Sequence, residues 1–118
     1  MSYYKHFTID QQGDVTEILL ANMDYFDVVH YAEFHEELMS FVEHEKPRNL
    51  LVRFDDVQYC STAIISALLK ARHRQVSEGR QIKLCGMNEA VRSSIRMLKL
   101  DGTVFDICDD AESAIAAF

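Results

Sequence analysis

The sequence has few of the residues that build common cofactor sites. It contains four glycines, one proline and three cysteines in 118 residues. Four scattered glycines cannot form a glycine-rich phosphate loop, and the sequence has no GxGxxG, GxxxxGK[ST] or HExxH motif. We therefore expect no cofactor, and we expect that the protein is not an enzyme.

The cysteines and histidines do not predict a metal site. Cys60, Cys85 and Cys108 are widely spaced and include no CxxC pair. Each cysteine lies in an apolar segment, which predicts buried free thiols. The histidines of residues 28–45 include no pair spaced one helical turn apart, so we expect no metal ion there.

Charge and hydropathy restrict the partners and the compartment. The net charge is −7; residues 1–45 hold one lysine and ten acids, and residues 46–118 hold eleven basic and nine acidic residues. The acidic half argues against nucleic acid as a partner. No apolar run approaches the roughly 20 residues that span a bilayer, and the first 14 residues lack the apolar segment of a signal peptide. We therefore expect a cytoplasmic protein that binds neither nucleic acid nor membrane.

Apolar periodicity predicts an α/β fold with the order β-β-α-β-α-β-α-β-α. The expected strands are Tyr3–Ile9, Val15–Leu20, Asn49–Phe54, Gln81–Cys85 and Val104–Ile107. The expected helices are Val28–Glu45, Thr62–Ser77, Glu89–Lys99 and a last helix ending at Phe118. Strands that alternate with helices of this length predict right-handed crossovers and a mostly parallel sheet. A chain of this length predicts a single domain over residues 1–118.

The same periodicity predicts the helix ends and the core. The expected N-caps are Asp24 or Asp27, then Asn88, then Asp109 or Asp110, and Gly79 is expected as a left-handed cap after Glu78. The expected core residues are Tyr4, Phe7 and Ile9; Tyr31, Phe34, Leu38, Phe41 and Val42; Ile65, Leu68, Leu69, Val76 and either Ala71 or Arg72; and Val91, Ile95 and Leu98.

The stretch from Asn49 to Leu69 carries the main functional signal. A short apolar strand is followed by an acidic turn, an extended piece and the hydroxyl pair Ser61-Thr62, after which a helical pattern begins. A hydroxyl residue at this place is a typical N-cap. A helix N-terminus also favours negative charge, so a phosphate there would be stabilised. On composition and spacing alone, a simple cap is the commoner explanation.

This stretch resembles the STAS domain family, the fold of bacterial anti-sigma factor antagonists. The family pattern is an apolar strand, a loop ending in Asp-Ser-Ser-Gly or Asp-Ser/Thr, and an Ala/Leu-rich helix. In the match from Val52 to Leu69, Ser61 takes the Asp place, Thr62 the next place, Ala63 the second Ser place and Ile64 the Gly place. Antagonists that cycle with a serine-kinase anti-sigma factor are typically phosphorylated on the second Ser, and Ala63 cannot accept phosphate. Stress-signalling scaffolds use the hydroxyl directly after the Asp, where Thr62 stands.

The C-terminal part of the chain is similar to the same family. Residues 84–92 resemble its apolar strand, Gly turn and helix start, and residues 98–105 resemble the segment that follows. The resemblance implies a STAS-like small mixed β-sheet of about five strands, with about four helices mainly on one side.

The resemblance also implies a function. The chain would be a non-enzymatic bacterial signalling module that binds a regulatory protein, an anti-sigma factor or a kinase-like protein. The candidate phosphoacceptors are Thr62 and Ser61. The expected partner-binding residues are Asp56, Gln58, Cys60, Ser61, Thr62, Ala63 and Ser66. A phosphate would add about two negative charges to this surface and weaken the binding of an acidic partner.

Two alternatives remain open. The first is a phosphorylation-independent STAS scaffold that forms homodimers or assembles with other STAS-containing proteins, which the alanine at position 63 favours. The second is a small-ligand sensor with a pocket lined by Tyr25, Phe26, Tyr31 and Tyr59. Aromatic side chains dominate protein cores, so core packing is the more ordinary role of these four residues.

Overall fold

A computed structural model describes residues 4–22 and 28–118 of the chain, and it confirms the predicted α/β fold and element order. The strands are β1 (Phe7–Gln12), β2 (Val15–Leu20), β3 (Asn49–Arg53), β4 (Gln81–Cys85) and β5 (Ile107–Cys108). The helices are α1 (Val28–Glu45), α2 (Thr62–Ser77), α3 (Glu89–Met97) and α4 (Ala111–Ala117). None of the helices in the described residues is long and apolar enough to cross a bilayer.

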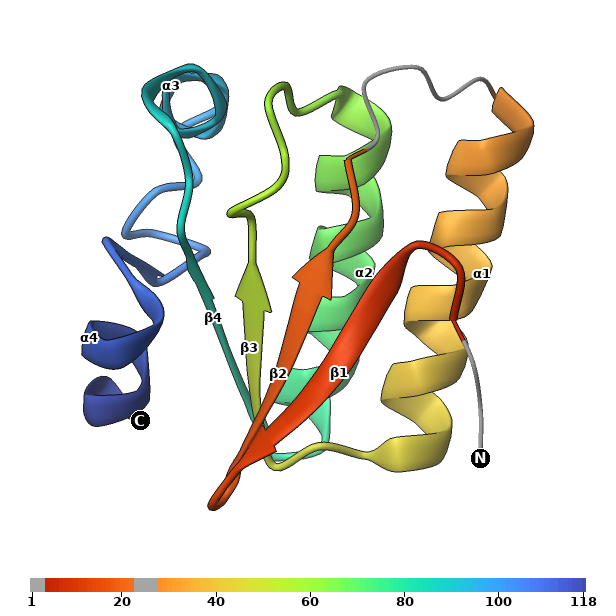
Figure 1. Cartoon of the computed structure of the whole chain (residues 1–118), viewed down its shortest axis with the longest axis vertical. Coiled ribbons are helices and arrows are strands. Elements are labelled where there is room, and N and C mark those ends of the chain that lie inside the picture. Colours follow the sequence, from red (N-terminus) through yellow and green to blue (C-terminus); the bar gives the residue numbers. More distant parts are fainter. Residues whose placement is uncertain (1–3, 23–27) are drawn as a thin grey trace.

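The strands form one mixed sheet with the spatial order β1-β2-β3-β4-β5. β1 and β2 are an antiparallel hairpin, and β2 to β5 pair in parallel. Parallel neighbours require a crossover, and α1, α2 and α3 supply the three crossovers in turn. Because β3 and β4 are parallel, the segments that follow them, the β3–α2 loop and α3, meet at one end of the sheet (Figure 1).

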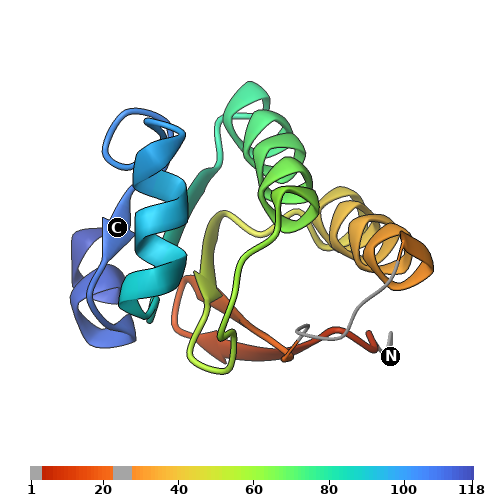
Figure 2. The same cartoon turned by 90° about the horizontal axis from the view of Figure 1, so that it is seen from above.

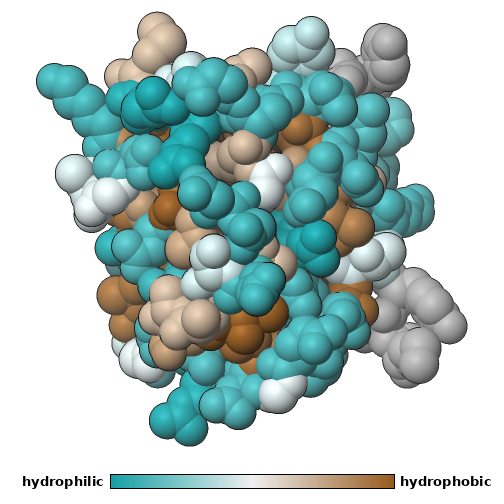
Figure 3. All heavy atoms as spheres, turned by 60° about the vertical axis from the view of Figure 1, so that its left-hand side comes forward, coloured by the Kyte–Doolittle hydropathy of each residue, from teal (hydrophilic) through white to brown (hydrophobic). Residues whose placement is uncertain are grey.

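Two helices cover one face of the sheet and α4 covers part of the other (Figure 2). Leu50 and Val52 of β3 belong to the main core with α1 and α2, whereas Leu51 belongs to a smaller cluster with Ala114 of α4. β3 is therefore buried on both faces, as its continuous apolar run predicts. The surface over α3, α4 and the adjoining part of the sheet is mainly hydrophilic and carries separate apolar patches (Figure 3).

The predicted bounds hold for β2, α1, α2 and β4. Asn88 and Asp110 are N-caps, and Gly79 has a φ of 74° after Glu78. The caps expected at Asp24 or Asp27 lie outside the described residues.

β1 starts and ends later than predicted, at Phe7 and Gln12 instead of Tyr3 and Ile9. Its pairing with β2 continues to Gln12, so the turn is only Gly13-Asp14. β1 is an edge strand with a single buried residue, Phe7, and Ile9 is 43% exposed rather than part of the core. The bounds of β1 are set by its hairpin pairing with β2. Such pairing needs no apolar periodicity, so the sequence pattern does not reveal these bounds. Tyr3 lies outside the described residues.

The segment between α3 and β5 also differs from the prediction. α3 ends at Met97, Lys99 is left-handed with a φ of 59°, and Leu98 is 49% exposed rather than buried. The amides of Val104 and Phe105 both bond the carbonyl of Leu100. These amides are used in a local turn, so β5 begins at Ile107 and not at Val104.

The buried face of α2 is only partly the predicted one. Ile65, Leu68 and Ala71 are buried as expected, but Leu69 is 36% and Val76 is 52% exposed. The side chain of Gln75 is fully buried in their place. Its Nε2 donates to the carbonyls of Pro47 and Gln81 at 2.8 and 2.9 Å, and its Oε1 accepts from Arg80 Nε at 2.8 Å. Gln75 therefore links the C-terminal turn of α2 to the starts of β3 and β4.

We expect Gln75→Leu to lower the free energy of unfolding by about 1–3 kcal/mol, because the buried carbonyl of Pro47 and the part-buried carbonyl of Gln81 lose their donor. Urea denaturation monitored by circular dichroism measures this change. Val76→Leu is the matched control, since Val76 is exposed on the same turn, and its stability should stay near that of the native sequence. Equal stability of the two variants would contradict a structural role for these hydrogen bonds.

Candidate functional site

The β3–α2 surface is the loop after β3 together with the first turns of α2 (Figure 1). Its proposed binding residues, defined from the sequence, are Asp56, Gln58, Cys60, Ser61, Thr62, Ala63 and Ser66. Only Cys60 and Ser61 of the seven are partly buried, and the others are exposed. Along the chain, Asp56, Gln58 and Cys60 alternate in the loop, Ser61, Thr62 and Ala63 are consecutive, and Ser66 follows one helical turn after Ala63. The structure thus exposes five of these seven residues on the loop and the first turns of α2.

Ser61 is the N-cap of α2. Its backbone is extended, with a φ of −81° and a ψ of 163°, and its Oγ accepts from the amide of Ile64 at 3.3 Å. Its carbonyl accepts from the amide of Ile65 at 3.2 Å. The hydroxyl of Ser61 is therefore occupied in holding the helix start.

Thr62 differs from Ser61 in both exposure and bonding. It is the first residue of α2 and is exposed, and within residues 4–22 and 28–118 its hydroxyl has no hydrogen-bond partner. Ala63, which follows, is exposed and carries no hydroxyl. Of the two candidate phosphoacceptors, Thr62 has the more accessible oxygen.

The loop before Ser61 is held to the neighbouring crossover. The amide of Val57 bonds the carbonyl of Phe54 at 3.0 Å, and the side chain of Val57 is buried. Nδ2 of Asn88 donates to the carbonyl of Gln58 at 3.0 Å, while its Oδ1 caps α3 by accepting from Val91 N at 2.8 Å. The sequence predicts Asn88 as a cap, but nothing in the sequence indicates its second bond, which ties α3 to the loop.

An ion-pair cluster fixes Asp55, near the start of the loop. Asp55 accepts from Nε and Nη2 of Arg53, both at 3.1 Å. This hydrogen bonding raises the pKa of Arg53. Nη1 of Arg53 also lies 3.6 Å from Oε1 of Glu17, a buried carboxylate on β2. Gly86 packs directly against the Asp55 carboxylate, since a Cβ added to Gly86 would lie 2.5 Å from Oδ1 of Asp55.

The cysteine of this surface is a partly buried free thiol that packs against the main core. Burial raises the pKa of Cys60 to about 12. Its Sγ makes only a weak contact with the carbonyl of Ser61 at 3.8 Å. The thiolate is the nucleophilic form, and it is scarce at neutral pH at this pKa. Cys60 thus contributes packing beneath the surface.

Two of the four aromatic residues suggested as a ligand pocket, Tyr31 and Tyr59, lie in the described part of the chain. Tyr59 is 70% exposed on the loop, and Tyr31 packs against the main core. Tyr25 and Phe26 lie outside the described residues. In the described part of the chain, no three His, Cys, Asp or Glu side chains are grouped so that they could hold a metal ion.

Comparison with known families agrees with this geometry. The sequence profile of the STAS domain matches residues 7–114, which include the whole β3–α2 surface. The chain belongs to the STAS domain family. A comparison with curated proteins finds no significant match.

Solved structures share this STAS fold at low sequence identity. A putative anti-sigma factor antagonist from Thermotoga maritima is 15% identical with a TM-score of 0.83, covering 94% of this chain and 92% of its own. An anti-sigma factor antagonist from Mycobacterium paratuberculosis is 15% identical with a TM-score of 0.78, covering 94% and 91%. The Bacillus cell fate determinant SpoIIAA in its phosphorylated form is 12% identical with a TM-score of 0.67, covering 94% and 97%.

Proposed function

We propose that this STAS domain is a non-enzymatic, cytoplasmic signalling module that binds a regulatory protein through the β3–α2 surface. The partner is an anti-sigma factor, a kinase-like protein or another STAS-containing protein. Family membership supports a signalling role, and the structural neighbours include anti-sigma factor antagonists. The contact residues are the exposed Asp56, Gln58, Thr62, Ala63 and Ser66, with Cys60 and Ser61 supporting them from below.

The observation that carries this proposal is the exposed hydroxyl of Thr62 at the start of α2. The loop that leads to it is fixed at Asp55 by Arg53 and at Gln58 by Asn88. A surface held in this way loses little conformational entropy when a partner binds. Such preorganisation supports a docking role for the surface.

Phosphorylation of Thr62 would act as a charge switch. A phosphate adds about two negative charges at the N-terminus of α2, where the unpaired amides and the helix dipole stabilise an anion. The fold would therefore tolerate the modification. Acidic groups of a docked partner would be repelled, so the partner would dissociate. One structural neighbour was determined in a phosphorylated form, which is consistent with such a mechanism in this family.

We expect Thr62→Glu to weaken partner binding at least tenfold while the melting temperature stays near that of the native sequence. The measurement is calorimetric titration with the partner captured from the native cells and then purified. Thr8→Glu is the matched control, because Thr8 is an exposed threonine on β1, away from the β3–α2 surface. Equal affinity of the two variants would contradict the charge switch.

A phosphorylation-independent scaffold is the second candidate function. Two observations favour it: Ala63 stands at the acceptor place of the antagonists, and the hydroxyl of Ser61 is bound to Ile64 N. Thr62 would then be an ordinary contact residue. Under this candidate, Thr62→Ala and the native sequence should bind the partner equally, and no phosphate should be found in cells.

A further inference from the structure

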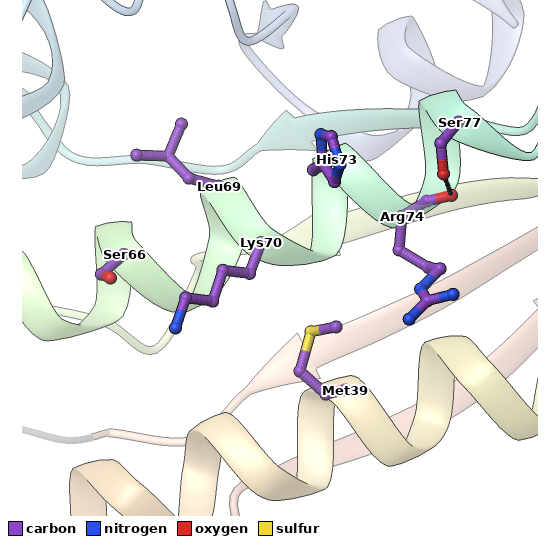
Figure 4. Close-up of a pocket in the computed structure, with 7 residues that line it drawn as sticks. All are labelled: Met39, Ser66, Leu69, Lys70, His73, Arg74 and Ser77. Atoms are coloured by element: carbon purple, nitrogen blue, oxygen red, sulfur yellow. Dashed lines mark hydrogen bonds between the residues drawn. The ribbon is translucent and has the colours of Figure 1, made fainter.

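A groove lies between α1 and α2 on the outer surface of these helices (Figure 4). Both helices lie on one side of the sheet (Figure 2). Its volume is about 590 Å³. It is lined by Met39 of α1 and by Ser66, Leu69, Lys70, His73, Arg74 and Ser77 of α2. Figure 4 shows Arg74 extending from α2 toward α1 and Met39 pointing from α1 toward α2, while Lys70 extends along α2 toward Ser66.

The two helices carry opposite charges on this outer face. α2 presents Lys70, His73 and Arg74, all exposed. α1 presents Glu36 and Glu43, which are exposed and lie three and four residues from Met39 and therefore on its side of the helix. Arg74 already pairs with Glu43 of the same chain at 3.1 Å. Lys70, His73 and Glu36 have no charged partner within the described part of the chain.

We propose that two copies of this chain associate through the α1/α2 outer face. The two-fold axis runs parallel to the helices between α1 and α2, so that α1 of each copy lies on α2 of the other. A two-fold contact must be complementary to itself. A face with an acidic helix beside a basic helix meets this condition, because the rotation places acids opposite cations twice.

The heights of the charges along the helices agree with this arrangement. The ion pair between Arg74 and Glu43 shows that these two residues lie at the same height along the parallel helices α2 and α1. Measured from that level at 1.5 Å per residue, Lys70 lies about 6 Å and Glu36 about 10 Å toward the N-termini. An axis parallel to the helices preserves these heights, so Lys70 of one copy faces Glu36 of the other with an offset of about 4 Å. A lysine side chain spans that offset.

The size of the face predicts a weak, reversible dimer. Helices of 18 and 16 residues are about 27 and 24 Å long, and two of them side by side present roughly 500 Å². Stable interfaces bury about 800 Å² on each partner. Association should therefore depend on concentration, and it should weaken with salt because its charged groups are exposed.

Sedimentation equilibrium of the purified chain at about 10 µM to 1 mM, in low and high salt, tests this inference. The native sequence should approach the mass of a dimer at high concentration in low salt. Lys70→Glu and Glu36→Lys should each remain monomeric when studied alone. An equimolar mixture of these two variants should dimerise, because both cross-pairs then join opposite charges. Arg48→Glu, an exposed cation on the loop after α1, should dimerise like the native sequence.

Each other outcome overturns the inference. A native chain that is monomeric at the highest concentration excludes the dimer. A dimer that neither charge reversal weakens must use another face. Reversals that abolish the dimer without rescue in the mixture exclude the pairing of Lys70 with Glu36. Circular dichroism of each variant confirms that the fold is kept. The test needs no other protein and does not depend on phosphorylation of Thr62.

Discussion

Leu68→Ala is expected to lower the free energy of unfolding by about 2–5 kcal/mol. Leu68 is fully buried on α2, within the main core that also contains Leu38 of α1 and Val52 of β3. Alanine lacks the Cγ and both Cδ atoms of leucine, and their loss leaves a cavity that the packed helices and sheet fill only in part. Urea denaturation gives the change directly from the midpoint and slope.

Leu69→Ala is the matched control for this prediction. The neighbouring Leu69 is 36% exposed on the outer face of α2, so its truncation should change stability by less than about 1 kcal/mol. The two variants differ only in which side of the helix loses the same atoms. If Leu69→Ala destabilised the protein as much as Leu68→Ala, the orientation of α2 described above would be wrong.

Gly86→Ala is expected to destabilise the protein by about 2–3 kcal/mol and to displace the start of the β3–α2 loop. Gly86 has a φ of 73°, where a side chain costs roughly 1–2 kcal/mol. The added Cβ would also lie 2.5 Å from Oδ1 of Asp55. Asp55 would then have to leave the position in which Arg53 holds it, and the loop would lose that anchor.

Gly102→Ala separates the two causes. Gly102 has a similar φ of 77°, but a Cβ there would meet nothing within 4 Å. Its free energy of unfolding should fall only by the backbone contribution. Adding Asp55→Ala to Gly86→Ala should reduce the effect of the glycine substitution to that of Gly102→Ala, as a double-mutant cycle measures. Equal effects of Gly86→Ala and Gly102→Ala in the native background would exclude the contact with Asp55.

The sequence predicts the fold well where periodicity and caps agree. α2 is the clearest case: a hydroxyl at Ser61, a helical apolar pattern and Gly79 after the last turn set its bounds correctly. Its buried face is less well predicted, because hydrophobicity alone selects Leu69 and Val76. The structure buries Gln75 instead, since three hydrogen bonds satisfy its amide. These hydrogen bonds require Pro47, Arg80 and Gln81 to lie close to Gln75 in the fold. Apolar periodicity in the sequence does not reveal that proximity.

Edge elements are the least predictable part of the fold. β1 is placed by its pairing with β2, and β5 by the turn around Leu100 that uses the amides of Val104 and Phe105. Neither the pairing nor the turn produces the alternation of apolar and polar residues from which a strand is predicted. The short strand β5 therefore begins at Ile107 instead of at the predicted Val104.

The candidate site shows the same division. Local pattern and family resemblance place Ser61 and Thr62 at the start of α2, and the capping bond of Ser61 follows from residue type. The supports of the loop come from distant parts of the chain: Asn88 from the next crossover, and Gly86 from the turn after β4. Both residues reach the loop only because β3 and β4 are parallel neighbours in the sheet. A single sequence does not reveal that arrangement.

The central claim is that Thr62 carries the regulatory charge of this STAS domain. Its most direct test is the intact mass and phosphosite map of the protein purified from its own cells, under resting and stressed growth, beside a Thr62→Ala variant. The switch predicts one added phosphate on Thr62 in at least one growth condition, and its loss in the variant. An unmodified native protein in both conditions, or a phosphate that persists in Thr62→Ala, would contradict it.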